Sequence, residues 1–290
     1  MNRIPPAIGA ILLMATSTLF LATMQALVRH LGQDIHSFQI TFINSVVGLV
    51  SLAVFSAFRK QHQFKSQRKK LLVLRGTVVA VANLMFFFGL TLTPLVEATS
   101  LSFVGIVFAV ILSVLFLREI MNLHRWISVI VAFAGIIAIL RPGYIEASLG
   151  AYAVLLSSLM WGFALVVAKV LARTESPVVI ITWSLLITCL VSSFFAISVW
   201  TPLSTEQLVK VILIGLCWTI GHTGMTKSLK MYDATVVLPV NCTRLVWAAI
   251  LGLLVFQEFP DFWTIFGSLL IVLSIIFLSQ SEVRNTKVSV

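Results

Sequence analysis

Arg244 is the residue whose type and position most need a chemical explanation. It lies in an apolar run, 236–256, that is long enough to be a membrane helix and contains no acidic residue. An arginine at membrane depth is costly unless it is paired or wetted. An unpaired guanidinium suits a carboxylate or phosphate, which it binds through two parallel hydrogen bonds. We therefore expect Arg244 to bind an anionic group of a substrate. The alternative is a structural pairing with carbonyls or with a distant acid such as Glu97.

Polar and aromatic residues accompany Arg244. Asn241 precedes it by three positions, so both would share one face of a helix. Pro239 permits a kink before them, and kinked helices with polar residues line cavities in transporters. The alternative is a packing kink with Asn241 bonded to a neighbouring helix. Trp161 and Trp247 are candidates for stacking on a substrate ring or cation, although such side chains more often pack against lipid or core.

Further polar residues at membrane depth fall into two groups. Asn44 and Asn83 are amides that would line a cavity and bond to substrate. An unperturbed histidine titrates near neutral pH, so His222 is a candidate for coupling transport to protons; the alternative is a hydrogen-bonded core histidine. The candidates for coupling or gating are His222 and three glutamates near helix ends: Glu97, Glu119 and Glu258.

The motifs of common enzyme classes are absent from the sequence. It has no HExxH zinc motif, no glycine-rich phosphate loop and no GxSxG nucleophile elbow. Its three cysteines, Cys189, Cys217 and Cys242, all lie inside apolar runs, which is typical of small core residues. We therefore expect no enzyme, no cofactor and no metal site.

Composition identifies the elements that must position these residues. Of 290 residues, 59% are hydrophobic and 10% are charged, whereas a soluble domain carries about 25% charged residues. The mean hydropathy of +1.07 points to the same class, an all-α membrane protein. A membrane helix needs about 20 apolar residues. The chain has ten such runs, at 7–28, 36–58, 71–93, 98–117, 124–140, 149–169, 177–199, 207–226, 236–256 and 262–279.

The charges support this count and predict an orientation. If the N-terminus is cytoplasmic, sixteen of the twenty basic residues fall on the inner side and three on the outer side, with Arg244 inside a helix. Such an excess orients membrane proteins with their basic loops inside. The net charge of +10 is then an orientation signal and does not indicate nucleic-acid binding. We expect both termini on the cytoplasmic side of a bacterial inner membrane.

The chain also contains an internal repeat at an offset of 139 residues. Leu112–Ile139 aligns with Leu251–Leu278, which places Glu119 on Glu258. Each half, 1–145 and 146–290, then holds five helices. Because five is odd, the second half would enter the membrane inverted relative to the first. Inverted repeats are typical of secondary transporters, whose substrate site lies near the midplane between the repeats.

Three stretches resemble the EamA-type drug/metabolite transporters: LRGTVVAVANLMFFFGLTLTPLVEATSLSF, FLREIMNLHRWISVIVAFAGIIAILRP and MYDATVVLPVNCTRLVWAAILGLLVFQEFPDFWTIFGSLLIV. The resemblance covers essentially the whole chain and implies ten helices in two five-helix repeats. Within the family, the pattern is similar to bacterial metabolite carriers, including S-adenosylmethionine carriers. Two positions depart from the family: Gly105, where it often has proline, and Asn44, where it often has arginine.

These features together predict a secondary transporter. Its substrate would be a small polar organic metabolite with an anionic group, such as an amino acid or S-adenosylmethionine. The alternative is a lipid flippase or a non-transporting partner in membrane assembly. The expected partners are a small-molecule substrate and the lipid bilayer, and the chain would act as a monomer or homodimer.

Overall fold

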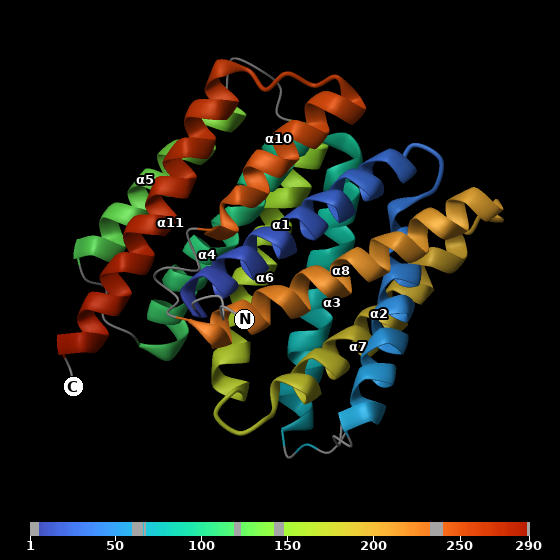
Figure 1. The fold of residues 1–290 in the computed structure, drawn as a ribbon, viewed down its shortest axis with the longest axis horizontal. Coiled ribbons are helices and arrows are strands. Elements are labelled where there is room, and N and C mark those ends of the chain that lie inside the picture. The colour runs from blue at the N-terminus through green and yellow to red at the C-terminus, as the bar shows by residue number, and fades with distance from the viewer. Residues whose placement is uncertain are drawn as a thin grey trace, which may run out of the picture.

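The computed structural model describes residues 6–59, 66, 68–118, 123–141, 148–232 and 240–288, and these form ten helices and no strand. The all-helical prediction is confirmed. In chain order the helices are α1 (Pro6–Leu31), α2 (Ser37–Arg59), α3 (Lys69–Leu92), α4 (Leu95–Leu117), α5 (Leu123–Leu140), α6 (Leu149–Leu171), α7 (Pro177–Ser198), α8 (Thr205–Met231), α10 (Thr243–Phe256) and α11 (Phe262–Val288) (Figure 1).

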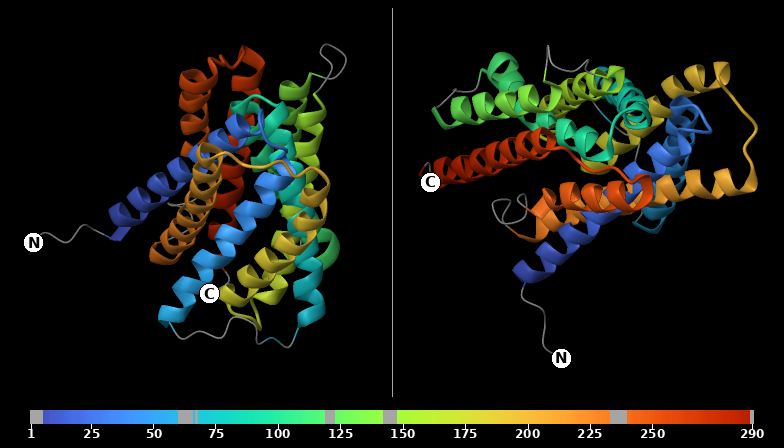
Figure 2. Two further views of the ribbon diagram at one scale, coloured as in Figure 1. Left: turned by 90° about the vertical axis from the view of Figure 1, so that its right-hand side faces the viewer. Right: turned by 90° about the horizontal axis from the view of Figure 1, so that it is seen from above.

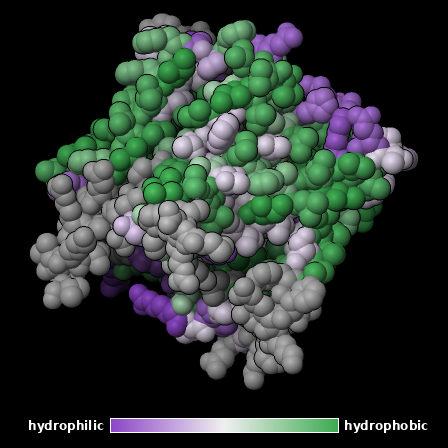
Figure 3. All heavy atoms as spheres, in the orientation of Figure 1, coloured by the Kyte–Doolittle hydropathy of each residue, from purple (hydrophilic) through white to green (hydrophobic). Residues whose placement is uncertain are grey.

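Seven of these helices are long and apolar enough to cross a membrane. Three shorter apolar stretches complete the set: Trp126–Leu140, Thr243–Phe256 and Phe262–Phe277. Large apolar side chains are exposed along most helices, and Figure 3 shows them covering most of one face, with hydrophilic side chains at its margins. Exposed apolar area on this scale indicates a multi-pass membrane protein. That all ten helices cross the membrane stays a prediction.

The ninth run differs from its prediction. An uninterrupted helix from 236 would place Arg244 eight residues inside it, but α10 begins at Thr243, after a turn at Cys242. Arg244 therefore lies in the first turn of α10. Pro239, the predicted kink, lies outside the described residues. Pro239 permits a kink in this run, but the hydropathy of the run does not show at which residue the next helix begins.

Serine caps set the starts of three helices in the second half. Ser148, Ser176 and Ser204 each accept a hydrogen bond from a backbone N–H in the first turn of α6, α7 and α8. Ser204 and Gln207 form a reciprocal capping box, which satisfies two otherwise unpaired N–H groups. These caps fix where the connecting loops turn.

The helices pack as a central group with one pair at the side. α1 packs on α8 and α10, α3 on α6 and α7, α2 on α7 and α8, and α4 on α6 and α10. α5 and α11 pack on each other at one side of the molecule (Figures 1 and 2). The buried apolar core lies mainly between α1, α3 and α4 and the helices that cover them. The polar side chains of interest are thereby enclosed by α1, α2, α4, α8 and α10.

Every second connection between successive helices lies at the same end of the helix bundle. Gln39, at the start of α2, bonds to Thr201 in the α7–α8 connection. His30, at the end of α1, lies 3.3 Å from the Lys210 ammonium on α8, measured from Nε2 to Nζ. At the other end, Ser66 donates to Glu175 and so joins the α2–α3 and α6–α7 connections. Connections lie at the two ends in turn when successive helices run in opposite directions.

The α5–α11 contact depends on two glycines. A Cβ built on Gly267 would lie 2.6 Å from the carbonyl oxygen of Gly135, and the reverse contact is 2.7 Å. We expect Gly267→Ala to destabilise the protein by about 1–3 kcal/mol through overpacking, because backbone cannot move aside. The matched control is Gly9→Ala on α1, whose Cβ would find its nearest neighbour at 3.5 Å. Thermal unfolding in detergent measures both; equal midpoints for the two variants would contradict this account.

Candidate functional site

Arg244 lies against two adjacent residues of α4. Its Nη2 atom donates to the Oγ of Ser102 over 3.3 Å. Its Cζ atom lies over the ring of Phe103, 4.5 Å from the ring centre. The Nε–H is buried and has no hydrogen-bond partner. No carboxylate in the described part of the chain forms an ion pair with Arg244. The described neighbours of Arg244 are therefore a hydroxyl group and an aromatic ring, and its role in binding a substrate stays a prediction.

His222 and Trp218 form an aromatic pair on α8 beside Arg244. Their rings are one helical turn apart, with centroids 4.6 Å from each other. His222 is close enough to Arg244 for their charges to interact. Trp218 also approaches α2, since a Cβ added at Gly48 would lie 3.9 Å from its ring. Asn44 lies one turn before Gly48 on that helix, so the packing of α2 on α8 places Asn44 on the same side of α2 as Trp218.

Several buried polar atoms in this region lack partners. The amide oxygens of Asn44 and Asn241 and the indole N–H of Trp247 make no hydrogen bond. Buried polar groups in folded proteins are nearly always hydrogen-bonded, and each exception is a place where water or a ligand would bind. Asn241, Arg244 and Trp247 follow one another within two turns of chain. Three of the ten unsatisfied buried atoms in the described part of the chain therefore lie around the start of α10, while six lie on α2, α3 and α7.

Two of the predicted binding residues are not brought to this cluster by any contact between described residues. Asn83 is buried on α3, and Trp161 is half-buried on α6. Their roles in binding stay predictions.

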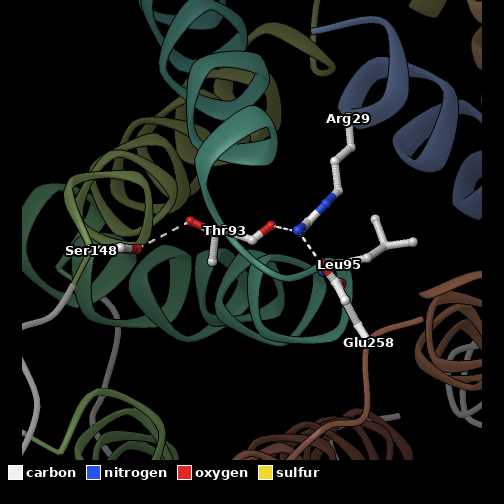
Figure 4. A network of polar contacts seen from close by, with 5 residues as sticks. All are labelled: Arg29, Thr93, Leu95, Ser148 and Glu258. Atoms are coloured by element: carbon white, nitrogen blue, oxygen red, sulfur yellow. Dashed lines mark hydrogen bonds and ion pairs between the residues drawn. The ribbon is translucent and has the colours of Figure 1, made fainter. Parts of the chain in front are cut away.

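Glu258 belongs to a separate polar network at the end where alternate connections meet. Arg29, on α1, forms an ion pair with Glu258 and also donates to the carbonyl oxygen of Thr93. The second carboxylate oxygen of Glu258 accepts from the backbone N–H of Leu95 over 3.1 Å. Figure 4 shows the Arg29 guanidinium reaching both Thr93 and Glu258, while Thr93 also reaches Ser148 at the start of α6. This network joins α1, α4, α6 and the α10–α11 connection.

Glu97 lies among these charges without pairing to them. Arg141 and Asp261 form a second ion pair there, and Glu97 interacts electrostatically with both pairs. Glu97 itself makes no hydrogen bond or ion pair with any described residue. Three carboxylates therefore face two guanidiniums, Arg29 and Arg141. Glu119, the fourth gating candidate, lies outside the described residues.

Asp261 stays charged in this cluster. Partial burial acts to raise the pKa of its carboxyl group, but hydrogen bonds from Thr264 and the charge of Arg141 outweigh that effect. The pKa of Asp261 consequently lies below its usual value. The Arg141–Asp261 pair is thus fully formed at neutral pH, and its contribution to stability is lost only as the pH falls through that lowered value.

Some residues of these sites were not found by sequence reasoning. Ser102 and Phe103 are inconspicuous in an apolar helix, although the 139-residue offset pairs Ser102 with Asn241 and could have drawn attention to it. Arg75 is one of the sixteen basic residues that the charge count places on the inner side. It lies in α3, where it donates to the Oγ of Ser184 on α7 and keeps a buried Nε without a partner.

Comparison with known proteins gives relatives over most of the chain. The S-adenosylmethionine uptake transporter of Rickettsia prowazekii is 26% identical over 257 residues, covering 89% of this chain and 87% of that protein. The pseudopaline exporter of Pseudomonas aeruginosa is 26% identical, covering 94% and 97% of the two chains. The riboflavin transporter of Vibrio cholerae is 26% identical, covering 67% and 65%.

The fold also has a solved counterpart. A protein crystal structure superposes with a TM-score of 0.62 at 17% identity, covering 96% of each chain. The profile of the EamA-like transporter family matches twice, at residues 8–141 and 148–280. The two matches leave no room for a separate catalytic domain between them. This chain therefore belongs to the EamA-like transporter family, and it is a transporter and not an enzyme.

Proposed function

We propose that this protein is a secondary transporter of a small polar metabolite that carries a carboxylate, working by alternating access in a bacterial inner membrane with both termini in the cytoplasm. One observation carries the proposal: the Nε–H of Arg244 is buried without a hydrogen-bond partner, and no carboxylate in the described part of the chain forms an ion pair with Arg244. A buried charge in this state is stable only if something else compensates it. A substrate carboxylate would do so with two charge-assisted hydrogen bonds.

Neighbouring groups suit the remainder of such a substrate. The unpaired amide oxygens of Asn44 and Asn241 would accept hydrogen bonds from an amino group. The rings of Trp218 and His222 would cover an apolar or cationic part. S-adenosylmethionine combines a carboxylate, an amino group and a sulfonium cation, and the relative in Rickettsia prowazekii is named for its uptake. It is therefore the first substrate to test.

We infer that residues 1–145 and 146–290 are two inverted repeats. The two family matches fall one in each half. Gly76 on α3 packs on Ile187 of α7, while Gly215 on α8 packs on Val47 of α2. Gly215 follows Gly76 by 139 residues, and Ile187 follows Val47 by 140. One contact is thus the counterpart of the other, with the halves exchanged, as a two-fold axis between repeats requires.

Helix ends support the same relation. Arg118 ends α4 with φ 55°, and Gln257 ends α10 with φ 56°, at the offset of 139 residues. Non-glycine residues in the left-handed region are uncommon, so two at equivalent positions are informative. In the α5–α11 contact, Ser274 donates to the carbonyl oxygen of Ser128. The position equivalent to Ser274 in the first half is Gly135, and the position equivalent to Ser128 in the second half is Gly267. These two glycines form the other close contact between the same helices.

The charged network at the outer end would be the gate. Arg29–Glu258 and Arg141–Asp261 tie connections of the first half to the α10–α11 connection of the second. A repeat that rocks away from the other must break these pairs and form them again. The proposal thus assigns Arg244 to substrate and Glu97 and Glu258 to gating.

Uptake by proteoliposomes tests the function. Vesicles containing the purified chain are expected to accumulate radiolabelled S-adenosylmethionine above protein-free vesicles, with competition by unlabelled compound. Competition by carboxylate-bearing amino acids, but not by their decarboxylated amines, would support the role of the carboxylate. Equal competition by both members of each pair would exclude a carboxylate site at Arg244.

A further inference from the structure

Phe103 covers the side of Arg244 that faces α4. Its side chain is 2% exposed, so the core holds it in place. The Arg244 Cζ atom lies over its ring face, 4.5 Å from the centre. The contact is a cation–π interaction, in which the ring stabilises the guanidinium while no anion is bound. It also means that a ligand can reach the guanidinium only along its edges or from the side away from α4.

Ser102 fixes the guanidinium further. Its hydroxyl hydrogen is donated to the carbonyl oxygen of Thr99 over 2.7 Å, so its oxygen faces Arg244 as an acceptor. A hydroxyl has a single hydrogen to donate. Ser102 therefore orients Arg244 and offers no hydrogen bond to an incoming anion. The unpartnered Nε–H is one of the guanidinium donors left free for a ligand.

This arrangement discriminates between anions by shape. A carboxylate is planar and pairs with two N–H groups of a guanidinium in one plane. A sulfonate or phosphonate bound through two oxygens carries its third oxygen and its carbon substituent on opposite sides of that plane. One of them would have to point toward the Phe103 ring, which the core prevents from moving aside.

We propose that Phe103, positioned beside Arg244 together with Ser102, makes this transporter select planar carboxylates over tetrahedral anions. The proposal rests on the proposed role of Arg244 as the anion site. Phe103 would be a specificity-determining residue contributed by the first half of the chain to an arginine of the second half.

Two small anions of similar size, acetate and methanesulfonate, are the probes. Thermal unfolding of the purified full chain in detergent is followed with each sodium salt, and the same titration of Arg244→Met subtracts effects that do not pass through Arg244. Wild type is expected to bind acetate about tenfold more tightly than methanesulfonate. Phe103→Ala is expected to bring that ratio close to one. Phe108→Ala on the same helix, whose ring contacts Phe133, is the matched control and should keep the ratio.

Each outcome decides something. Equal protection of wild type by both anions would overturn the selectivity while leaving Arg244 as the anion site. No protection beyond that of Arg244→Met would overturn the proposed function itself. A ratio that survives Phe103→Ala would remove the assignment to Phe103. If that variant does not fold, Phe103→Leu keeps most of the volume without the flat ring, and an unchanged ratio there would equally contradict the proposal.

Discussion

Arg244→Lys is expected to lower S-adenosylmethionine uptake by about ten- to a hundredfold, because a lysine keeps the charge but loses the bidentate fork. Arg244→Ala should lose at least as much. The effect should appear mainly as a higher KM, since the guanidinium is assigned to binding the carboxylate. Uptake into proteoliposomes at several substrate concentrations separates KM from the maximal rate.

The matched control for Arg244→Lys is Arg68→Lys, because Arg68 is an exposed arginine just before α3. Its uptake should equal that of wild type. The amount of folded protein in the vesicles must be the same for all variants. Arg244→Lys keeps the positive charge and leaves no described carboxylate without its partner, so lost uptake in a fully folded Arg244→Lys would locate the defect in binding. Wild-type kinetics of that variant would rule out a substrate role for Arg244.

Helix positions were predictable from the sequence because each membrane helix is an apolar run bounded by charges or caps. α6, for example, starts within a residue of its predicted run, at the Ser148 cap. The position of the break before α10 was not predictable: Pro239 permitted a kink in this run, but the sequence did not show that the next helix would begin only at Thr243. The end of a run shows in hydropathy, whereas a turn inside a run shows only in backbone geometry.

The candidate site likewise contains residues that the sequence indicates and residues that it does not. Arg244 was predictable as a candidate, because a charged residue inside an apolar run can be recognised in the sequence. Its partners Ser102 and Phe103 are 142 and 141 positions away and resemble any other residues of an apolar helix. Arg29 is, in the sequence, a single charge near the end of an apolar run, and nothing there indicates that it pairs with Glu258 across 229 positions. Such pairings depend on which helix ends meet, and that is a property of the packing.

Breaking the Arg29–Glu258 pair is expected to hold the outer end open and to slow transport at least about tenfold. Both side chains are largely shielded from water, at 15% and 21% exposure, so the pair is less screened than a surface ion pair. Arg29 is also held over the Phe256 ring, with its Cζ 5.0 Å from the ring centre. Glu258→Gln removes the charge with little change of shape. The Arg29 guanidinium then loses its carboxylate partner, and one connection between the two halves is weakened.

Cys242 is a natural reporter of this opening, because it lies two residues from Arg244 and is half-buried. In a chain with Cys189 and Cys217 replaced by serine, an impermeant thiol reagent added outside should label Cys242 faster in Glu258→Gln than with Glu258 intact. Glu206→Gln is the matched control: Glu206 pairs with Lys210 at the same end, but its side chain is 77% exposed, and such pairs contribute little. Its labelling and uptake should not change.

The charge-reversed double variant, Arg29→Glu with Glu258→Arg, makes the test specific. It restores the attraction but not the bond from the Leu95 N–H, because an arginine cannot accept it. Partial recovery of uptake and of Cys242 protection is therefore expected, above either single variant and below wild type. Full recovery would mean that charge attraction alone closes the outer end. No recovery at all, with the double variant folded, would mean that the hydrogen bonds to Thr93 and Leu95 close it and that the ion pair is incidental.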